Sequence, residues 1–191
     1  MKLRWITVGL LASCVPLAAV AQEHSHREVG AHVHGEVEIS IVQFGKQLTI
    51  ELHSPLFNIL GFEHAPSTAV EKKAAADASR ALNKALLVAV PSPASQCKLS
   101  SSDVALPFDD HHHEDAHGKD AGHQEDGDAH HHSELTATYV FDCAQLDRLT
   151  HIDITALRAF PNIKTAEVVF LGPQTQLSRK LNAASSVFEL K

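Results

Sequence analysis

The folded part of the sequence opens with a strict alternation of apolar and polar positions. From Ala31 onward, every second residue is apolar or small and the residues between are polar, which is the pattern of a half-buried β-strand. A turn at residues 44–46 follows, and residues 47–53 alternate in the same way until Ser54 and Pro55 end the run. The pattern predicts an antiparallel hairpin near the start of the domain.

The alternation also limits how the two strands of this hairpin can pair. Their apolar positions must share one face, so odd residues of the first strand lie opposite even residues of the second. One allowed register pairs His53 with Glu36 and Glu51 with Glu38. The polar face would then bring together four candidate metal ligands: His32, His34, Glu36 and His53. An ordinary solvated sheet face is the alternative interpretation of the same pattern.

The next clear signal is a helix. Residues 55–66 have the pattern of a loop with apolar residues, after which Thr68 and Glu71 form a capping box. The helical pattern runs to about Leu87, and two prolines close behind end it. Its inward stripe contains Val70, Ala74, Ala78, Ala81, Leu82, Ala85 and Leu86.

Strand-like segments dominate the rest of the chain. Residues 97–106 and 134–143 are predicted to pair as antiparallel strands, with residues 109–133 as an oversized connection. The later segments are a strand at 151–154, a brief helix at 157–161, a strand at 167–171 and a final pair of strands within 174–190. Runs of strands with a single long helix predict an α+β fold, with an antiparallel sheet and a disordered loop rich in His and Asp.

Residues 1–21 have the features of a cleaved signal peptide. A basic start precedes an apolar stretch at residues 5–17, and an A-x-A cleavage site ends at Ala21. The stretch is too short for a membrane span. Cys14 lies in a lipobox-like sequence, so a lipoprotein is the alternative. We therefore predict a periplasmic protein whose residues 22–191 form a single domain, with no membrane insertion after cleavage.

Export limits the chemistry of the two cysteines that remain, Cys97 and Cys143. An oxidising compartment favours a disulfide between them, and this bridge agrees with the predicted pairing of the strands that carry them. Zinc ligation by the two thiolates is the alternative, but neither cysteine has the CxxC or CxxH spacing of a zinc site.

The charge of the chain indicates cations as partners. The formal net charge is −7. Removal of the leader takes away two basic and no acidic residues, so the mature chain carries −7 − 2 = −9. This balance disfavours nucleic acid and anionic lipid as partners and favours divalent metal ions.

Residues 109–133, the histidine-rich segment, concentrate metal-binding chemistry. They hold eight of the 15 histidines, eight acidic residues and no aromatic or branched aliphatic residue, so they cannot build a core of their own. Imidazole and carboxylate are ligands that zinc prefers. A solubilising acidic linker is the plain alternative, yet it would need no imidazole. The candidate ligands are His111, His112, His113, His117, His123, His130, His131 and His132.

The free-energy cost of ordering this segment limits the type of metal site that it can form. Fixing its 25 residues at roughly 1–2 kcal/mol each exceeds the ~10–16 kcal/mol that a good structural zinc site contributes. We therefore expect local, exchanging chelates of modest affinity. Such sites suit capture and handoff and not catalysis, and the sequence has no H-E-x-x-H motif or nucleophile elbow. No enzyme is expected, and the chain is too short for a bilobed solute-binding protein.

Three sequence blocks outside this segment resemble those of a known family. They are H-x-H-G at residues 32–35, S-P…N-x-x-G-F-E-H-A-P at residues 54–66 and Y-x-F-x-C at residues 139–143. Together they resemble the zinc-regulated, periplasmic zinc-binding proteins of Gram-negative bacteria (ZrgA-like). The central insert rich in His and Asp is similar as well, and the resemblance covers essentially the whole mature chain.

The resemblance implies a function and a set of site residues. It implies a periplasmic zinc-binding protein that supports zinc uptake as an accessory to a zinc ABC importer, with the importer's solute-binding protein as a partner. Zinc would be bound by the eight histidines of residues 109–133, with His32, His34 and His64 as further candidates. Buffering or detoxification of zinc, nickel or copper(II) is the alternative function, because imidazole binds all three ions.

Overall fold

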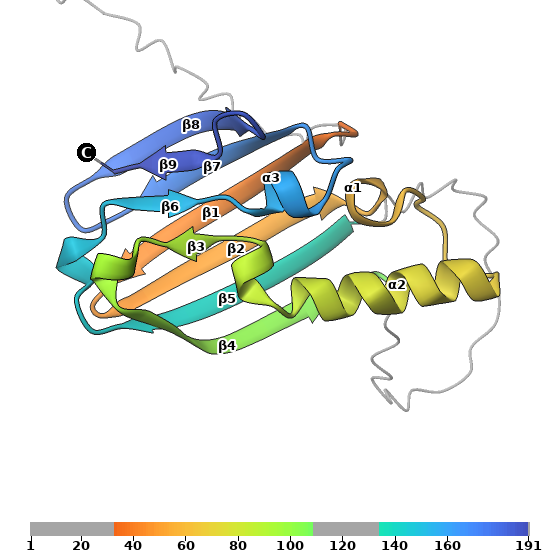
Figure 1. The fold of residues 1–191 in the computed structure, drawn as a ribbon, viewed down its shortest axis with the longest axis horizontal. Helices are drawn as coiled ribbons and strands as arrows, with labels where there is room; N and C mark the ends of the chain where they lie inside the picture. The colour runs from red at the N-terminus through yellow and green to blue at the C-terminus, as the bar shows by residue number, and fades with distance from the viewer. Residues whose placement is uncertain (1–32, 109–133, 191) are drawn as a thin grey trace, which may run out of the picture. The chain divides into compact units, whose positions relative to one another are not determined.

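The computed structural model describes residues 33–108 and 134–190, and within them the chain forms nine strands in two sheets (Figure 1). The strands are β1 (Glu36–Phe44), β2 (Gln47–Pro55), β3 (Val90–Pro91), β4 (Cys97–Ala105), β5 (Glu134–Cys143), β6 (His151–Asp153), β7 (Thr165–Leu171), β8 (Gln176–Asn182) and β9 (Val187–Glu189). The helices in this part of the chain are α1 (Phe57–Leu60), α2 (Ala69–Leu82) and α3 (Ala156–Ala159). Single 3-10 turns are η1 (Ala85–Leu87), η2 (Pro93–Ser95) and η3 (Leu146–Arg148).

The larger sheet has six strands in the order β4-β5-β2-β1-β7-β8, and the smaller sheet has three in the order β3-β6-β9. The predicted α+β fold with one long helix is therefore wrong, because the described residues are mostly β structure with short helices. The larger sheet is not purely antiparallel either, since β1 and β7 run parallel. The second sheet was not predicted because β3 has only two residues, too few to show an alternation, and because β6 pairs with segments far from it in the chain.

The β1–β2 hairpin forms as predicted but in a different register. It closes with Phe44 opposite Gln47, which leaves two residues in the turn, and the first of these is a glycine with a φ of 58°. This tight turn places His53 opposite Glu38, two residues from its predicted partner Glu36. The apolar positions of the two strands share one buried face, as predicted.

One face of the six-stranded sheet forms the core. Side chains from its four central strands are fully buried there, among them Ile41, Ile50 and Leu135. The smaller sheet and the helices cover this face (Figure 1). Burial of one such side chain contributes about 1.5–3 kcal/mol, so this face supplies the main driving force for folding. The opposite face carries exposed polar side chains such as Glu38 and Glu167.

Helix α2 begins as the sequence predicts and ends earlier. Its capping box is present: the Thr68 hydroxyl accepts from the Glu71 amide, and the Glu71 carboxylate accepts from the Thr68 amide. The backbone hydrogen bonds from Thr68 and Ser67 lower the pKa of Glu71 to about 2. The helix stops at Leu82, about five residues before its predicted end, and the Tyr139 hydroxyl donates to the Leu82 carbonyl over 2.7 Å.

The early end of α2 changes which residues face the core. Ala75, Ala78 and Leu82 form the buried side of the helix. Leu86 was predicted to continue this side, but it belongs to η1 and is 61% exposed. Val70, in the first turn of the helix, is 79% exposed. The predicted inward stripe is thus wrong at both of its ends.

Strands β4 and β5 pair antiparallel as predicted, and they place Cys97 opposite Cys143. The predicted disulfide joins these two cysteines. The other ends of the two strands lead into residues 109–133, which lie outside the described residues. The strand pair therefore has the disulfide at one end and the histidine-rich segment at the other.

The predicted leader, residues 1–21, also lies outside the described residues. The start of the domain at residue 22 lies there too, so both boundaries stay predictions. Within residues 33–108 and 134–190, no helix is long and apolar enough to cross a membrane.

Candidate metal centre

Most of the predicted zinc ligands fall outside the described residues. They are His32, His111, His112, His113, His117, His123, His130, His131 and His132. Their role as ligands stays a prediction. The scaffold (residues 33–108 and 134–190) contains the two remaining candidates, His34 and His64, together with His53 from the hairpin.

Two of these scaffold histidines lie at one end of the six-stranded sheet. Pro55, the last residue of β2, pairs with Glu134, the first residue of β5. Strands β1 and β7 pair in parallel from their first residues. The end of β2 and the starts of β5, β1 and β7 therefore lie at the same end of the sheet. His34 comes just before β1, and His53 lies near the end of β2. The histidine-rich segment joins the scaffold at this same end, through the start of β5.

His34 has partners on two sides although half of its side chain is exposed. Its Nε2 atom lies 2.8 Å from Oε1 of Glu63, within hydrogen-bond distance. Its ring stacks on the Phe57 ring, with 4.2 Å between the centroids and an interplanar angle of 11°. The side chains of His34 and Glu63 are 50% and 38% exposed, so an ion from solvent can reach both.

A buried asparagine in α1 holds the backbone that carries His34. Asn58, which is 1% exposed, accepts a hydrogen bond from the Gly35 N–H over 2.6 Å and donates to the Glu36 carbonyl over 2.8 Å. Gly35 has a φ of 89°, and a Cβ atom there would lie 3.1 Å from Cγ of Lys164. A larger residue would be strained at this position. Backbone contacts therefore set the position from which His34 projects.

Glu63 reaches His34 because α1 ends in a left-handed cap. Gly61 has a φ of 83°, and its N–H donates to the Phe57 carbonyl over 2.8 Å. The chain reverses direction at this cap and brings Glu63 to the imidazole ring of His34. The short helix α1 thus supplies both the stacking ring and the turn that positions the carboxylate.

His64 contacts a different set of neighbours. Its ring stacks on Phe62 with 5.0 Å between the centroids. Its Nδ1 atom lies 3.1 Å from the Ala65 carbonyl oxygen, and its Nε2 atom lies 3.8 Å from Oε1 of Glu71. These contacts join His64 to the start of α2 rather than to the His34–Glu63 pair.

The second metal site predicted on the hairpin face is not formed by the described residues. His53 Nε2 lies 2.7 Å from Glu51 Oε1, and Glu36 binds Lys180, whose hydrogen bond lowers the pKa of the Glu36 carboxyl. The shifted register explains this, because it moves His53 away from Glu36. Among residues 33–108 and 134–190, no group of three or more His, Cys, Asp or Glu side chains could hold a metal ion. The scaffold offers His–carboxylate pairs instead.

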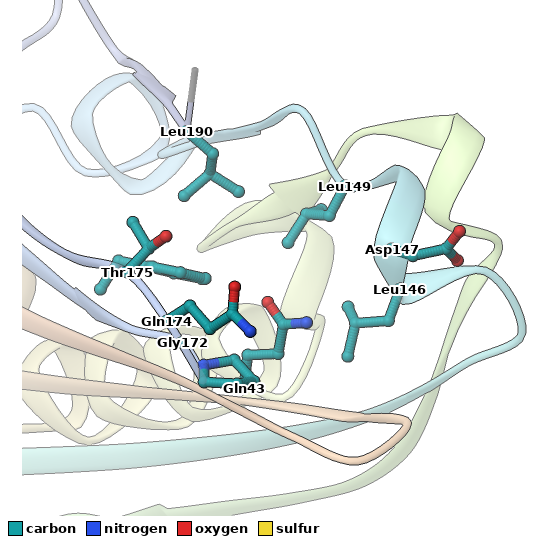
Figure 2. A pocket seen from close by; sticks show the side chains of 10 residues that line it. Gln43, Leu146, Asp147, Leu149, Gly172, Gln174, Thr175 and Leu190 are labelled. Carbon is teal, nitrogen blue, oxygen red and sulfur yellow. The ribbon is translucent and has the colours of Figure 1, made fainter.

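A pocket of about 260 Å³ lies at the other end of the sheet (Figure 2). The end of β1, the β7–β8 turn and η3 contribute to its lining. Its walls combine apolar side chains such as Leu149 and Leu190 with the amides of Gln43 and Gln174. Figure 2 shows the side chain of Asp147, the one carboxylate among the lining residues, directed away from the pocket. This lining does not suit zinc.

One family model spans the whole scaffold. Residues 31–190 match the ZrgA family zinc uptake protein. The chain belongs to this family. Membership of the ZrgA family confirms the resemblance seen in the sequence and gives the chain a role in zinc uptake. A search of curated proteins found no match.

Two residues around His34 were not predicted from the sequence. Asn58 and Glu63 both lie in the S-P…N-x-x-G-F-E-H-A-P block that carries the ZrgA family resemblance. The block was interpreted as a loop, so the helical turn that places Asn58 against β1 was missed. A signal was present, because an isolated Asn among apolar residues is typical of a buried side chain with several hydrogen bonds.

Proposed function

We propose that this protein captures zinc in the periplasm through the histidines of residues 109–133 and supports uptake by passing the ion to a zinc ABC importer. The observation that carries the proposal is the concentration of eight histidines and eight acidic residues in 25 positions of a ZrgA family chain. Zinc is the cargo in this account, and no reaction is catalysed.

The composition of the histidine-rich segment also indicates how it would bind zinc. Because it contains no residue that could build a core, zinc is bound by local groups of a few ligands. Sites that do not order the whole segment have modest affinity and release the ion readily. Ready release is what delivery to a tighter binder requires. The proposed recipient is the solute-binding protein of the importer.

The scaffold fixes the two points at which the histidine-rich segment joins it. Ala105 of β4 pairs with Thr136 of β5, so the chain leaves and re-enters the sheet on neighbouring strands. The Cys97–Cys143 disulfide closes the other end of this strand pair. Across a separation of 46 residues, a disulfide contributes roughly 4 kcal/mol in the chain-entropy model. These features support a scaffold whose folding does not depend on zinc.

The proposed location rests on the N-terminal sequence. Cleavage after Ala21 would release residues 22–191 as a single domain that carries the histidine-rich segment and three further ligands. These ligands are His32, His34 and His64. The disulfide supports this location, because such bridges persist in oxidising compartments.

Equilibrium dialysis against zinc tests the proposal. The wild-type chain is compared with a full-length variant in which the eight histidines of residues 109–133 are replaced by Gln. The wild type is expected to bind several ions, and the variant is expected to lose all but those bound by the scaffold. A matched variant with the eight acidic residues of the segment changed to Asn or Gln measures the share held by carboxylates.

The pH dependence of the same measurement identifies the ligand type. Imidazole binds zinc only when neutral, and its ordinary pKa is about 6.5. Bound zinc should therefore fall steeply between about pH 7 and pH 5.5. Undiminished binding by the Gln variant, or an unchanged stoichiometry at about pH 5, would refute capture by the segment's histidines.

A further inference from the structure

We infer that Glu63 is a zinc ligand and that, with His34, it forms a fixed zinc-binding pair on the scaffold, at the end of the six-stranded sheet where the histidine-rich segment joins it. The inference rests on the proposed function in taking zinc as the cargo, but it does not require the segment to bind. It adds to the predicted ligands a carboxylate that the sequence did not single out.

The distance between the two side chains fits a ligand pair. Zinc holds nitrogen and oxygen ligands at about 2.0–2.2 Å, so two ligands of a tetrahedral site lie roughly 3.4 Å apart. Nε2 of His34 and Oε1 of Glu63 are 2.8 Å apart. An opening of roughly 0.6 Å would therefore turn the hydrogen bond into a pair of zinc ligands.

The pair is also held more firmly than an ordinary surface ion pair. Exposed pairs contribute about 0–1 kcal/mol because two mobile side chains must be ordered to form them. Here the His34 ring already stacks on Phe57, and the buried Asn58 holds the backbone on the C-terminal side of His34. Support of this kind keeps ligands in place before an ion arrives.

The His53–Glu51 pair is a suitable comparison. Its Nε2 and Oε1 atoms are 2.7 Å apart, and its side chains are 42% and 40% exposed, close to the values for His34 and Glu63. However, His53 and Glu51 lie two residues apart on one strand, where alternation alone places them on the same face. Their contact needs no special support, so it serves as the matched control.

The two ligands leave room for others. Zinc takes four ligands in most protein sites. Water can occupy the positions that His34 and Glu63 leave open. A site that keeps a water ligand exchanges its ion more easily than a closed structural site. This suits an ion that is to be passed on.

Binding at this pair requires the proton of the His34 ring to move. A carboxylate only accepts hydrogen bonds, so Nε2 carries the proton in its contact with Glu63. Zinc binds the lone pair of Nε2, and the ring proton then lies on Nδ1 while the ring stays neutral. In the competing arrangement zinc binds Nδ1, and Glu63 keeps its hydrogen bond from Nε2.

The test uses the full-length chain in which the eight histidines of residues 109–133 are Gln, so that only scaffold sites remain. Glu63→Gln and the control Glu51→Gln are each made in this background. Zinc affinity is measured by competition with a chromophoric chelator. Long-range ¹H–¹⁵N spectra show which nitrogen of His34 binds the ion, and thermal unfolding checks that each variant is folded.

We expect the background chain to bind one zinc ion through Nε2 of His34. Loss of an outer hydrogen bond to a ligand lowers affinity about 10–100-fold, so loss of a ligand should cost at least about 10-fold in Glu63→Gln. Glu51→Gln should bind like the background. Equal affinity of the two variants, zinc on Nδ1, or no binding by the background chain would each overturn the inference. If the background chain binds no zinc but the wild-type chain does, this inference fails and the proposed function stands.

Discussion

Replacement of Asn58 by alanine tests how the backbone next to His34 is held. The Asn58 side chain is buried and makes three hydrogen bonds: it accepts from the Gly35 amide and donates to the Glu36 carbonyl and the Ser54 hydroxyl. Each bond contributes about 0.5–1.5 kcal/mol net, and a buried backbone group left without a partner costs about 1–3 kcal/mol. We expect Asn58→Ala to lower the free energy of unfolding by about 3 kcal/mol. For a domain of this size the melting temperature should fall by about 6–12 °C.

Urea unfolding followed by circular dichroism, with the disulfide intact, measures the change at Asn58. The slope of the free energy against urea should stay the same, because the variant unfolds the same core. Ser54→Ala is the control: it removes the weakest of the three Asn58 bonds, at 3.3 Å, together with the bond that the Ser54 hydroxyl donates to the Pro55 carbonyl, and should cost about 1–2 kcal/mol. An Asn58→Ala protein no less stable than the control would refute the reasoning.

Three other outcomes follow from the contacts described. Tyr139→Phe removes the donor to the buried Leu82 carbonyl and should lower the free energy of unfolding by about 1–2 kcal/mol in urea titration; an unchanged midpoint would contradict this. Glu71 has a folded pKa of about 2, below its ordinary value, so its contribution to stability is present above about pH 4.5 and is lost as the pH falls toward 2. Glu71→Gln should therefore reduce the drop in melting temperature over that range, and an unchanged drop would count against the capping box. Replacement of both Cys97 and Cys143 by Ser should cost roughly 4 kcal/mol and leave zinc stoichiometry unchanged, whereas loss of zinc would indicate thiolate ligands.

The long strands could be predicted because each carries its own alternation of apolar and polar residues. The β1–β2 hairpin and the β4–β5 pair were both evident in this way, and Cys97 and Cys143 supported the second. The hairpin register was wrong because it depends on how many residues the turn contains, which periodicity does not determine. The parallel pairing of β1 with β7 joins segments far apart in the chain, and no local pattern reports it.

The candidate site was predicted only in part, again because it joins residues that are far apart in the chain. His34 stood out by residue type, but its partners Phe57 and Glu63 lie more than 20 residues later, on a four-residue helix and just after it. A helix this short shows no period of its own. The fold class was wrong because α2 stops at Leu82 and because the short strands β3, β6 and β9, which come from distant parts of the chain, pair to form a second sheet.

Growth under zinc limitation tests the central claim most directly. A strain that lacks the protein is grown with a zinc chelator and complemented with the wild-type gene or with the full-length variant in which the eight histidines of residues 109–133 are Gln. The account predicts that the wild type restores growth and that the variant, present at the same level, does not. Equal rescue by the variant, or a strain sensitive only to excess zinc, would contradict the claim that captured zinc is used for uptake.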